Sequence, residues 1–174
     1  DIFQSWLKQM LALKPGVPMW LAASVNSEGS VPPVTLGDFW GGAAASGDEA
    51  VISPAFTSRG KEMVDSLIKE IEAAIADPLI FAGRKQEFNR WHRNNSFESW
   101  EAFCIGFSKG KARLKTKEEW QKKASQMSTD EGPYFALITK IASDLKPLTE
   151  EGSAPAWLSQ VYELQSARSI GTAG

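Results

Sequence analysis

The chain has 174 residues, of which 43% are hydrophobic and 23% charged, with a formal net charge of −2 at pH 7. This composition is typical of a soluble globular protein that can bury a sizeable core, as one domain or as two small lobes. The weak negative charge argues against nucleic acid as a partner. A single Cys and a single His exclude a disulfide framework and a four-ligand structural zinc site within this chain.

The sequence contains no run that approaches the roughly 20 apolar residues of a transmembrane helix. It begins at Asp1 and carries no signal-peptide pattern. We therefore expect it to be a fragment of a longer protein, with any membrane anchor or targeting signal outside it.

The first third of the chain, residues 1–56, has a less regular pattern than the rest. Apolar residues at helical spacing predict a helix over 2–14, which the following Pro-Gly pair ends. Residues 17–25 are short and apolar and fit either a helix or a strand. Residues 26–33 and 41–48 are rich in small and turn-forming residues and predict loops. This third is where we allow for a short extended segment.

Helical periodicity becomes regular from Thr57, which is a good N-cap residue. The helix that it starts carries an apolar stripe up to Ile75 and is expected to end at Asp77-Pro78. A second helix is predicted from about Ile80 to Arg93. The polar run Asn94-Asn95-Ser96 is expected to separate it from a third helix that ends at Gly110.

Two further helices have clear start signals. Thr116 and Glu119 fit a capping box for a short helix to about Met127, in which Trp120 is expected to face the core. Gly132-Pro133 begins the next helix, because proline is favoured at the first helical position. This helix is expected to end at Pro147.

The last helix is expected to begin at Ser153–Pro155 and to be followed by a flexible tail, 169–174. Its inward-facing residues are predicted to be Trp157, Leu158, Val161 and Leu164. The predicted fold is all-α, an irregular bundle of about six to eight helices. It forms a single domain over 1–168, less regular in 1–56 and a helical bundle in 57–168.

Candidates for catalysis are few, because the chain has only one His and one Cys. His92 is expected to be a partly exposed helix residue, and Cys104, between Phe103 and Ile105, to pack in the core. A His92–Cys104 dyad is the enzymatic alternative. The run from Gly106 is one residue short of a phosphate-binding loop and follows a helix, which excludes it. We expect no catalytic, cofactor-binding or metal-binding residues.

Basic residues cluster in one stretch of the chain, from residue 84 to residue 123. They are Arg84, Lys85, Arg90, Arg93, Lys109, Lys111, Arg113, Lys115, Lys117, Lys122 and Lys123. The favoured interpretation is a solvated helical surface. An anionic membrane surface or an acidic partner is the alternative.

Seven Trp residues are a high number for this length. Trp91, Trp100 and Trp120 fit helix-core positions. Trp20 and Trp40 lie in Pro- and Gly-rich sequence, where packing on the bundle is the default interpretation. Since Trp is also enriched at interfaces, these two are the candidate partner contacts.

Four segments of the chain resemble the IcmF/TssM family. They are V-T-L-G-D-F-W-G-G (Val34–Gly42), V-I-S-P-A-F-T-S-R-G (Val51–Gly60), the aromatic stretch F-N-R-W-H-R-N-N-S-F-E-S-W-E-A-F-C-I-G-F (Phe88–Phe107), and E-G-P-Y-F-A-L-I-T-K-I-A-S-D-L-K-P-L (Glu131–Leu148). His92 stands where the family pattern has Tyr. The resemblance implies an aromatic core made of Phe56, Phe88, Trp91, Trp100, Phe103, Phe107, Tyr134 and Phe135.

This family forms the inner-membrane core of the bacterial type VI secretion system. The resemblance implies a non-catalytic scaffold module from the periplasmic region of an inner-membrane protein, without nucleotide chemistry. It also implies three kinds of partner: an outer-membrane lipoprotein (TssJ), a second inner-membrane protein (TssL) and other copies of the parent protein. A helical peptide- or protein-binding module unrelated to secretion is the alternative.

Overall fold

The structure is a computed structural model and describes residues 5, 18–45, 47–75, 79–150 and 152–171. These residues form seven α-helices, two 3-10 helices and one two-stranded antiparallel sheet. The predicted all-α class is confirmed, and the extended segment lies in the N-terminal third. The helix predicted over 2–14 falls outside the described residues, apart from Ser5.

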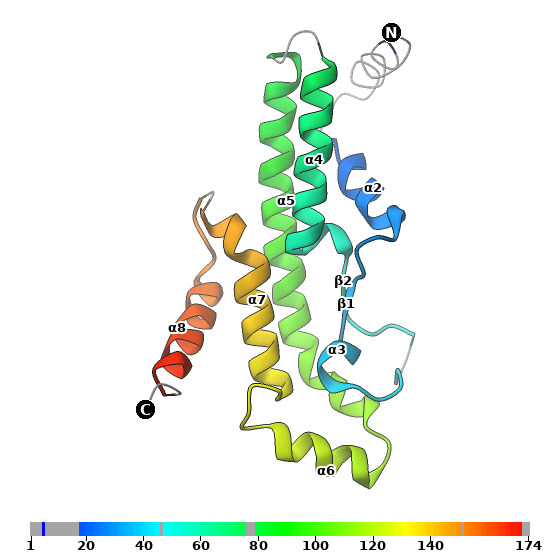
Figure 1. The fold of residues 1–174 in the computed structure, drawn as a ribbon, viewed down its shortest axis with the longest axis vertical. Helices are drawn as coiled ribbons and strands as arrows, with labels where there is room; N and C mark the ends of the chain where they lie inside the picture. The colour runs from blue at the N-terminus through cyan, green and yellow to red at the C-terminus, as the bar shows by residue number, and fades with distance from the viewer. Residues whose placement is uncertain (1–4, 6–17, 46, 76–78, 151, 172–174) are drawn as a thin grey trace.

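Two long helices, α4 (Ser58–Ala74) and α5 (Leu79–Gly106), run side by side along the elongated molecule (Figure 1). Helix α2 (Trp20–Glu28) and the 3-10 helix η1 (Pro54–Phe56) pack against α4. Together with the first half of α5 they enclose one hydrophobic cluster, the upper core. It consists of Leu21, Ala22, Val25, Ala55, Val64, Ile68, Ile71, Ile75, Phe81 and Phe88.

The predicted N-cap of α4 is confirmed. The backbone N–H of Gly60 donates to the Thr57 hydroxyl at 3.1 Å. Of residues 17–25, which fitted either a helix or a strand, residues 20–25 form part of α2. Helix α4 ends at Ala74, and the stop signal predicted at Asp77-Pro78 lies outside the described residues.

The break predicted at Asn94-Asn95-Ser96 is wrong, because α5 passes through it as one helix of 28 residues. The Asn95 side-chain amide donates to the Trp91 carbonyl at 2.8 Å, within the helix. Ser96 is fully buried. Tertiary packing on both sides of α5 therefore outweighs the weak helix propensity of these three residues.

The helix end predicted at Gly110 is also wrong. α5 ends at Gly106, and the 3-10 helix η2 (Phe107–Arg113) follows it. Gly110 lies inside η2, where a Cβ would come within 2.1 Å of the Trp40 ring. This glycine therefore permits close packing of η2 on an aromatic side chain and does not end an α-helix.

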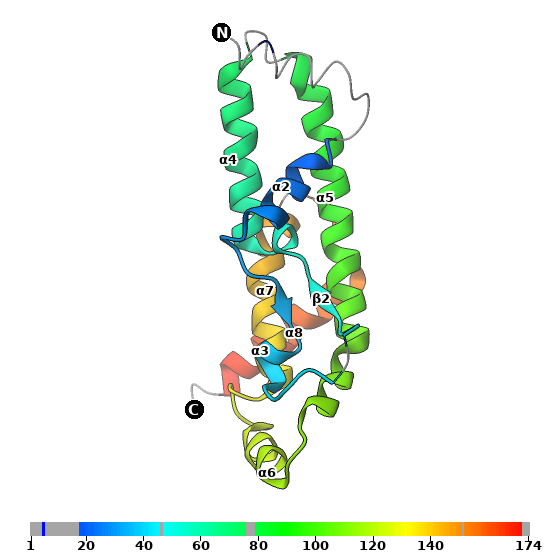
Figure 2. The same ribbon diagram turned by 90° about the vertical axis from the view of Figure 1, so that its right-hand side faces the viewer.

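The second hydrophobic cluster, the lower core, lies around the second half of α5. Strands β1 (Val34–Thr35) and β2 (Val51–Ile52) pair antiparallel, with Val34 opposite Ile52. Helices α3 (Gly37–Trp40), α7 (Pro133–Glu150) and α8 (Ala156–Gly171) complete the cluster (Figure 2). Its members are Val34, Leu36, Phe39, Trp40, Ile52, Phe97, Trp100, Phe103, Phe107, Leu114, Leu137, Ile141, Leu145, Leu148 and Leu158.

Helix α6 (Lys117–Gln126) begins with the predicted capping box. Glu119 N–H donates to the Thr116 hydroxyl, and Thr116 N–H donates to the Glu119 carboxylate. The prediction that Trp120 faces the core is wrong, since its side chain is 43% exposed and α6 has no buried residue. The reason is position: α6 lies across one end of the molecule, where little packs over it (Figure 1).

The last two helices start where predicted, at Pro133 and just after Pro155. However, α7 continues through Pro147 to Glu150. Proline has no backbone N–H, so the carbonyl of Ser143, four residues earlier, loses its helical donor. Both residues are exposed, so water can bind this carbonyl instead. Leu158 is buried as predicted, whereas Leu164 is 57% exposed because it lies on the outer side of α8.

Helix α8 extends to Gly171, and residues 172–174 are not described. Within the described ranges, no helix combines the length and the apolar character needed to cross a bilayer.

Candidate binding groove

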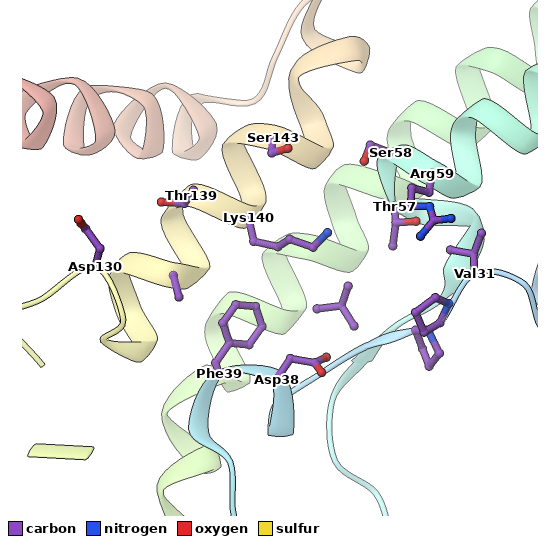
Figure 3. A pocket seen from close by; sticks show the side chains of 14 residues that line it. Val31, Asp38, Phe39, Thr57, Ser58, Arg59, Asp130, Thr139, Lys140 and Ser143 are labelled. Atoms are coloured by element: carbon purple, nitrogen blue, oxygen red, sulfur yellow. The ribbon is translucent and has the colours of Figure 1, made fainter. Parts of the chain in front are cut away.

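A groove of about 820 Å³ lies between α7, the first turn of α4, and the segment that leads into β1 and α3. Its size is in the range typical of ligand-binding clefts. Figure 3 shows side chains from all three walls pointing into it. The lining residues are Val31, Pro32, Pro33, Val34, Asp38, Phe39, Thr57, Ser58, Arg59, Asp130, Ala136, Thr139, Lys140 and Ser143.

One wall is apolar with a single carboxylate at its edge. Pro33 and the buried residues Val34 and Phe39 supply the apolar surface. The Asp38 carboxylate accepts hydrogen bonds from Thr35, from its backbone N–H at 2.6 Å and from its hydroxyl at 3.1 Å. These bonds hold Asp38 at the mouth of the groove as a fixed negative charge.

The first turn of α4 forms the end of the groove. Thr57 is buried, and its hydroxyl donates to the Pro54 carbonyl at 2.7 Å while it caps the helix. Gly60 lies so close to η1 that a Cβ would stand 1.9 Å from the Pro54 carbonyl oxygen. This packing presents Arg59 to solvent, where its guanidinium makes no ion pair with the described residues.

A buried acidic group of α7 lies behind the groove lining. Asp144 is 3% exposed, and its carboxylate accepts a hydrogen bond from the Ser58 hydroxyl at 2.9 Å. Lys140 lies one turn earlier, with Nζ 3.1 and 3.0 Å from the two carboxylate oxygens. The three side chains connect α7 to the start of α4. The aliphatic part of Lys140 extends from α7 across the groove toward α4 (Figure 3).

An ion pair bounds the far end of the groove, and its two residues belong to none of the three walls. Asp130, in the turn before α7, pairs with Arg168 of α8, with its Oδ1 2.6 Å from the arginine Nε. The Arg168 guanidinium also stacks over the Phe135 ring, 3.5 Å from its centre. Cation–π stacking fixes the arginine and thereby the position of Asp130.

The groove therefore combines an apolar floor with charges of both signs that are already held in place. Such a lining fits a peptide segment with small apolar side chains flanked by polar ones. Sequence reasoning did not identify these residues as a site. One signal was present: Asp144 falls between Ile141 and Leu145 on the apolar face of α7, a position where a carboxylate needs a partner.

The structure does not bring the two candidate catalytic residues together. His92 and Cys104 lie twelve residues apart on α5, which corresponds to about 18 Å along the helix axis. Burial, and next the charge of Glu101, raise the pKa of the Cys104 thiol to about 11. A thiol with this pKa is protonated at neutral pH, so the predicted alternative of a Cys/His dyad is not formed.

His92 was expected to be partly exposed, and this is wrong: it is 1% exposed. Its Nε2–H donates to the Ala55 carbonyl at 2.6 Å, and its ring lies between those of Phe56 and Phe88. The local sequence around His92 is polar, but this side of α5 faces η1. The histidine therefore has a structural role in joining the two elements. Among the described residues, no group of three or more His, Cys, Asp or Glu side chains is placed to hold a metal ion.

The two candidate partner contacts, Trp20 and Trp40, do not line the groove. Trp40 is 1% exposed, and its indole N–H donates to the Phe107 carbonyl at 3.1 Å. Its position in the core corrects the expectation that it is available to a partner. Trp20 is half-buried and packs against the upper core.

The aromatic residues of the family-like segments differ in burial. Phe88, Trp100, Phe103 and Phe107 are fully buried, as predicted. Phe56, Trp91 and Phe135 are half-buried. Tyr134 is 40% exposed, so its placement in the core is wrong, although one side of its ring contacts Trp40 and Phe107. It lies in the first turn of α7, where the helix is covered from one side.

Comparisons of the chain with protein-family models, curated proteins and solved structures found no match. The resemblance to the IcmF/TssM family thus depends on the four sequence segments 34–42, 51–60, 88–107 and 131–148. The contacts that these segments make with one another in the fold are therefore the structural observation that bears on it.

Proposed function

We propose that this chain is a structural, non-catalytic module of the periplasmic part of a type VI secretion membrane complex. Its role there would be to link inner- and outer-membrane components through protein–protein contacts. The observation that carries the proposal is that the four family-like segments, which are scattered along the sequence, contact one another through their most distinctive residues.

Two hydrogen bonds to backbone carbonyls join the segment 51–60 to the aromatic stretch of α5. The Trp100 indole N–H donates to the Phe56 carbonyl at 3.0 Å, and His92 donates to the Ala55 carbonyl. Buried indole and imidazole donors need such partners, because an unpaired buried polar group is costly. The Thr57 and Gly60 positions of the same segment then allow α4 to start directly against η1.

The other two segments meet at the opposite end of the aromatic stretch. Tyr134 contacts the ring of Trp40 with centres 5.6 Å apart and the ring of Phe107 with centres 5.4 Å apart. Edge-to-face pairs of this kind add to the stability supplied by burial alone. The residues that carry the resemblance are therefore mutual contacts, which supports reading them as one motif set that specifies this fold.

The groove is the surface that we assign to partner binding. Its floor is apolar, and its charged groups Asp38, Lys140 and Asp130 already have hydrogen-bond or ion-pair partners, so they can orient a ligand without rearranging. The expected partners are a TssJ-like outer-membrane lipoprotein, a TssL-like inner-membrane protein, or another copy of the parent protein.

Site-specific photo-crosslinking tests this assignment. A photoreactive phenylalanine analogue replaces Thr139, an exposed groove residue, or Gln86, an exposed residue of α5 outside the groove lining, as the matched control. Each variant is mixed with the TssJ-like lipoprotein, the TssL-like protein and unlabelled chain. We expect crosslinks to one of these proteins from position 139 and none from position 86.

The possible outcomes distinguish an error in the location of the interface from an error in the proposed function. Crosslinks from position 86 alone would move the interface away from the groove. The lack of crosslinks to all three proteins from both positions, with both variants folded by circular dichroism, would contradict a role in the secretion complex.

The alternative is a peptide-binding helical module unrelated to secretion, and the groove itself is the observation that favours it. Selection from a random-peptide library discriminates the two functions. Two results together would favour this alternative. The selection would enrich a peptide motif whose binding is abolished by Thr139→Arg, and the chain would not bind the secretion proteins.

A further inference from the structure

The end of the molecule formed by η2 and α6 carries an excess of positive charge. Residues 107–127 contain seven Lys or Arg and two Glu, whereas the whole chain has a formal net charge of −2. The remainder of the protein therefore carries a net negative charge. The positive charge is concentrated at the end of the long axis where α6 lies (Figure 1).

Part of this charge is used within the fold. Arg113 forms an ion pair with Glu49 and donates to the Gly41 and Gly42 carbonyls, which fastens the loop after α3 to η2. Lys123 Nζ donates to the Phe39 carbonyl at 3.0 Å. Burial, followed by the neighbouring charge of Lys122, lowers the pKa of Lys123.

The other basic residues project into solvent. We define the basic tip as the exposed lysines Lys109, Lys111, Lys115, Lys117 and Lys122 together with Trp120. The ammonium groups of these lysines make no hydrogen bond or ion pair with the described residues. They are thus free to contact an external anionic surface.

Trp120 provides a second, independent observation. Its side chain is 43% exposed on a helix that buries no residue, so α6 contributes nothing to either core. Lys117 precedes it by three residues and lies on the same side of α6. An exposed indole beside lysines is the combination that anchors proteins at the headgroup level of a membrane.

We propose that the basic tip docks the protein on the surface of an anionic phospholipid bilayer. The lysines belong to η2, to α6 and to the link between them, and these segments form one end of the elongated molecule (Figure 2). An extended anionic surface can meet such an arrangement at once. Lys111, Lys115, Lys117 and Lys122 lie outside the groove of Figure 3 and outside the smaller cavity lined by Lys109. An acidic peptide held in a cleft would not engage them together. Membrane docking at this end does not depend on the proposed secretion function.

The test is co-sedimentation of the 174-residue chain with vesicles of phosphatidylcholine alone or of phosphatidylcholine with phosphatidylglycerol. We expect binding only to the anionic vesicles, weakening as salt rises above ~0.1 M, where screening shortens the reach of each charge to about 10 Å. A blue shift of Trp fluorescence that is lost in Trp120→Phe would place the indole at the lipid interface.

Charge reversal locates the binding surface. Each lysine near an anionic membrane contributes about fivefold to partitioning, so Lys111→Glu/Lys117→Glu/Lys122→Glu should weaken binding by roughly a hundredfold or more. The matched control, Lys69→Glu/Arg90→Glu/Lys146→Glu, changes the net charge equally at exposed positions elsewhere and should bind more tightly than the tip variant. Circular dichroism checks that both triple variants are folded.

Three results would overturn the proposal. The first is wild-type protein that ignores anionic vesicles at low salt. The second is an equal loss of binding in the tip and control variants, which would reflect net charge alone. The third is binding of the tip to polyglutamate but not to vesicles, which would identify an acidic protein as the partner. If the triple tip variant is unfolded, Trp120→Gln in the intact lysine background provides the same comparison through loss of partitioning.

Discussion

The upper and lower cores bury their apolar side chains in different ways. The upper core is mainly aliphatic and lies between regular helices, with Phe81 and Phe88 as its aromatic members. The lower core has six aromatic residues among its fifteen described members, and much of it is supplied by short irregular elements. Large rings fill the spaces that short strands and 3-10 turns leave against α5.

This difference explains where the groove is found. Helix–helix packing in the upper core follows from the helical periodicity of its apolar residues. Beside the lower core, β1, α3 and the preceding prolines lie opposite α7, and the groove lies between them. The irregular elements therefore supply one wall of the candidate site, and the regular helices α7 and α4 supply the others.

The largest expected effect is the loss of an aromatic anchor of the lower core. Trp100 is fully buried and donates to the Phe56 carbonyl, so Trp100→Ala creates a cavity and leaves that carbonyl without its donor. We expect a loss of about 4 kcal/mol in the free energy of unfolding. Urea denaturation followed by circular dichroism measures it. Trp120→Ala, at an exposed position, should cost less than about 1 kcal/mol; equal losses would mean that the lower core does not depend on the Trp100 ring.

The next effect tests the join between η1 and α4 at the upper core. A Cβ at Gly60 would approach the Pro54 carbonyl oxygen to 1.9 Å, so Gly60→Ala must displace backbone and should destabilise the fold by about 3 kcal/mol. Gly83 is the matched control, because it lies in α5 and the position that a Cβ would take has no neighbouring atom within 4 Å. Gly83→Ala should stabilise the protein by about 0.5–1 kcal/mol. Thermal and urea denaturation measure both variants, and a harmless Gly60→Ala would show that η1 can move away from α4.

Features governed by local rules could be predicted from the sequence. The Thr57 N-cap, the Thr116–Glu119 capping box and the start of α7 at Pro133 each depend on a few neighbouring residues. The regular stripe of α4 predicted its buried side for the same reason. These signals operate within one or two turns of helix, whatever the rest of the chain does.

Features governed by distant contacts could not be predicted from the sequence. The polar run at 94–96 lies within α5 because packing on both sides holds it there, and Pro147 is tolerated because its turn is exposed. His92 is buried by η1, which comes from 37 residues earlier. The groove has no local signature at all, since its walls come from three separate segments. Only the carboxylate of Asp144 on an apolar face indicated that something polar lay opposite.

A smaller effect tests the link between the two halves. Lys140→Met removes the ammonium beside the buried Asp144 carboxylate and leaves the Ser58 hydroxyl as a donor to it. Because the Lys140 side chain is 41% exposed, we expect a loss of about 2 kcal/mol in the free energy of unfolding, less than for a fully buried pair. Lys146→Met, at an exposed position of the same helix, should change stability by less than about 0.5 kcal/mol. Recovery in Lys140→Met/Asp144→Leu would identify the uncompensated charge as the cause.

The smallest effect concerns the loop that Arg113 fastens beside the lower core. A hydrogen bond from the Ala45 N–H, and then the Arg113 guanidinium, hold the pKa of Glu49 below its usual value of 4.5. Because the pKa is lower in the folded state, the stabilisation is complete above about pH 4.5 and is lost as the pH falls through the folded value. Glu49→Gln should therefore be less stable than wild type at neutral pH, and the difference should shrink in acid. Glu87→Gln, at an exposed position of α5, is the control. Amide exchange should show the acid-induced loosening at Ala45 and not in α4, because the upper core makes no use of this ion pair; uniform loosening of both regions would contradict the separation of the two cores.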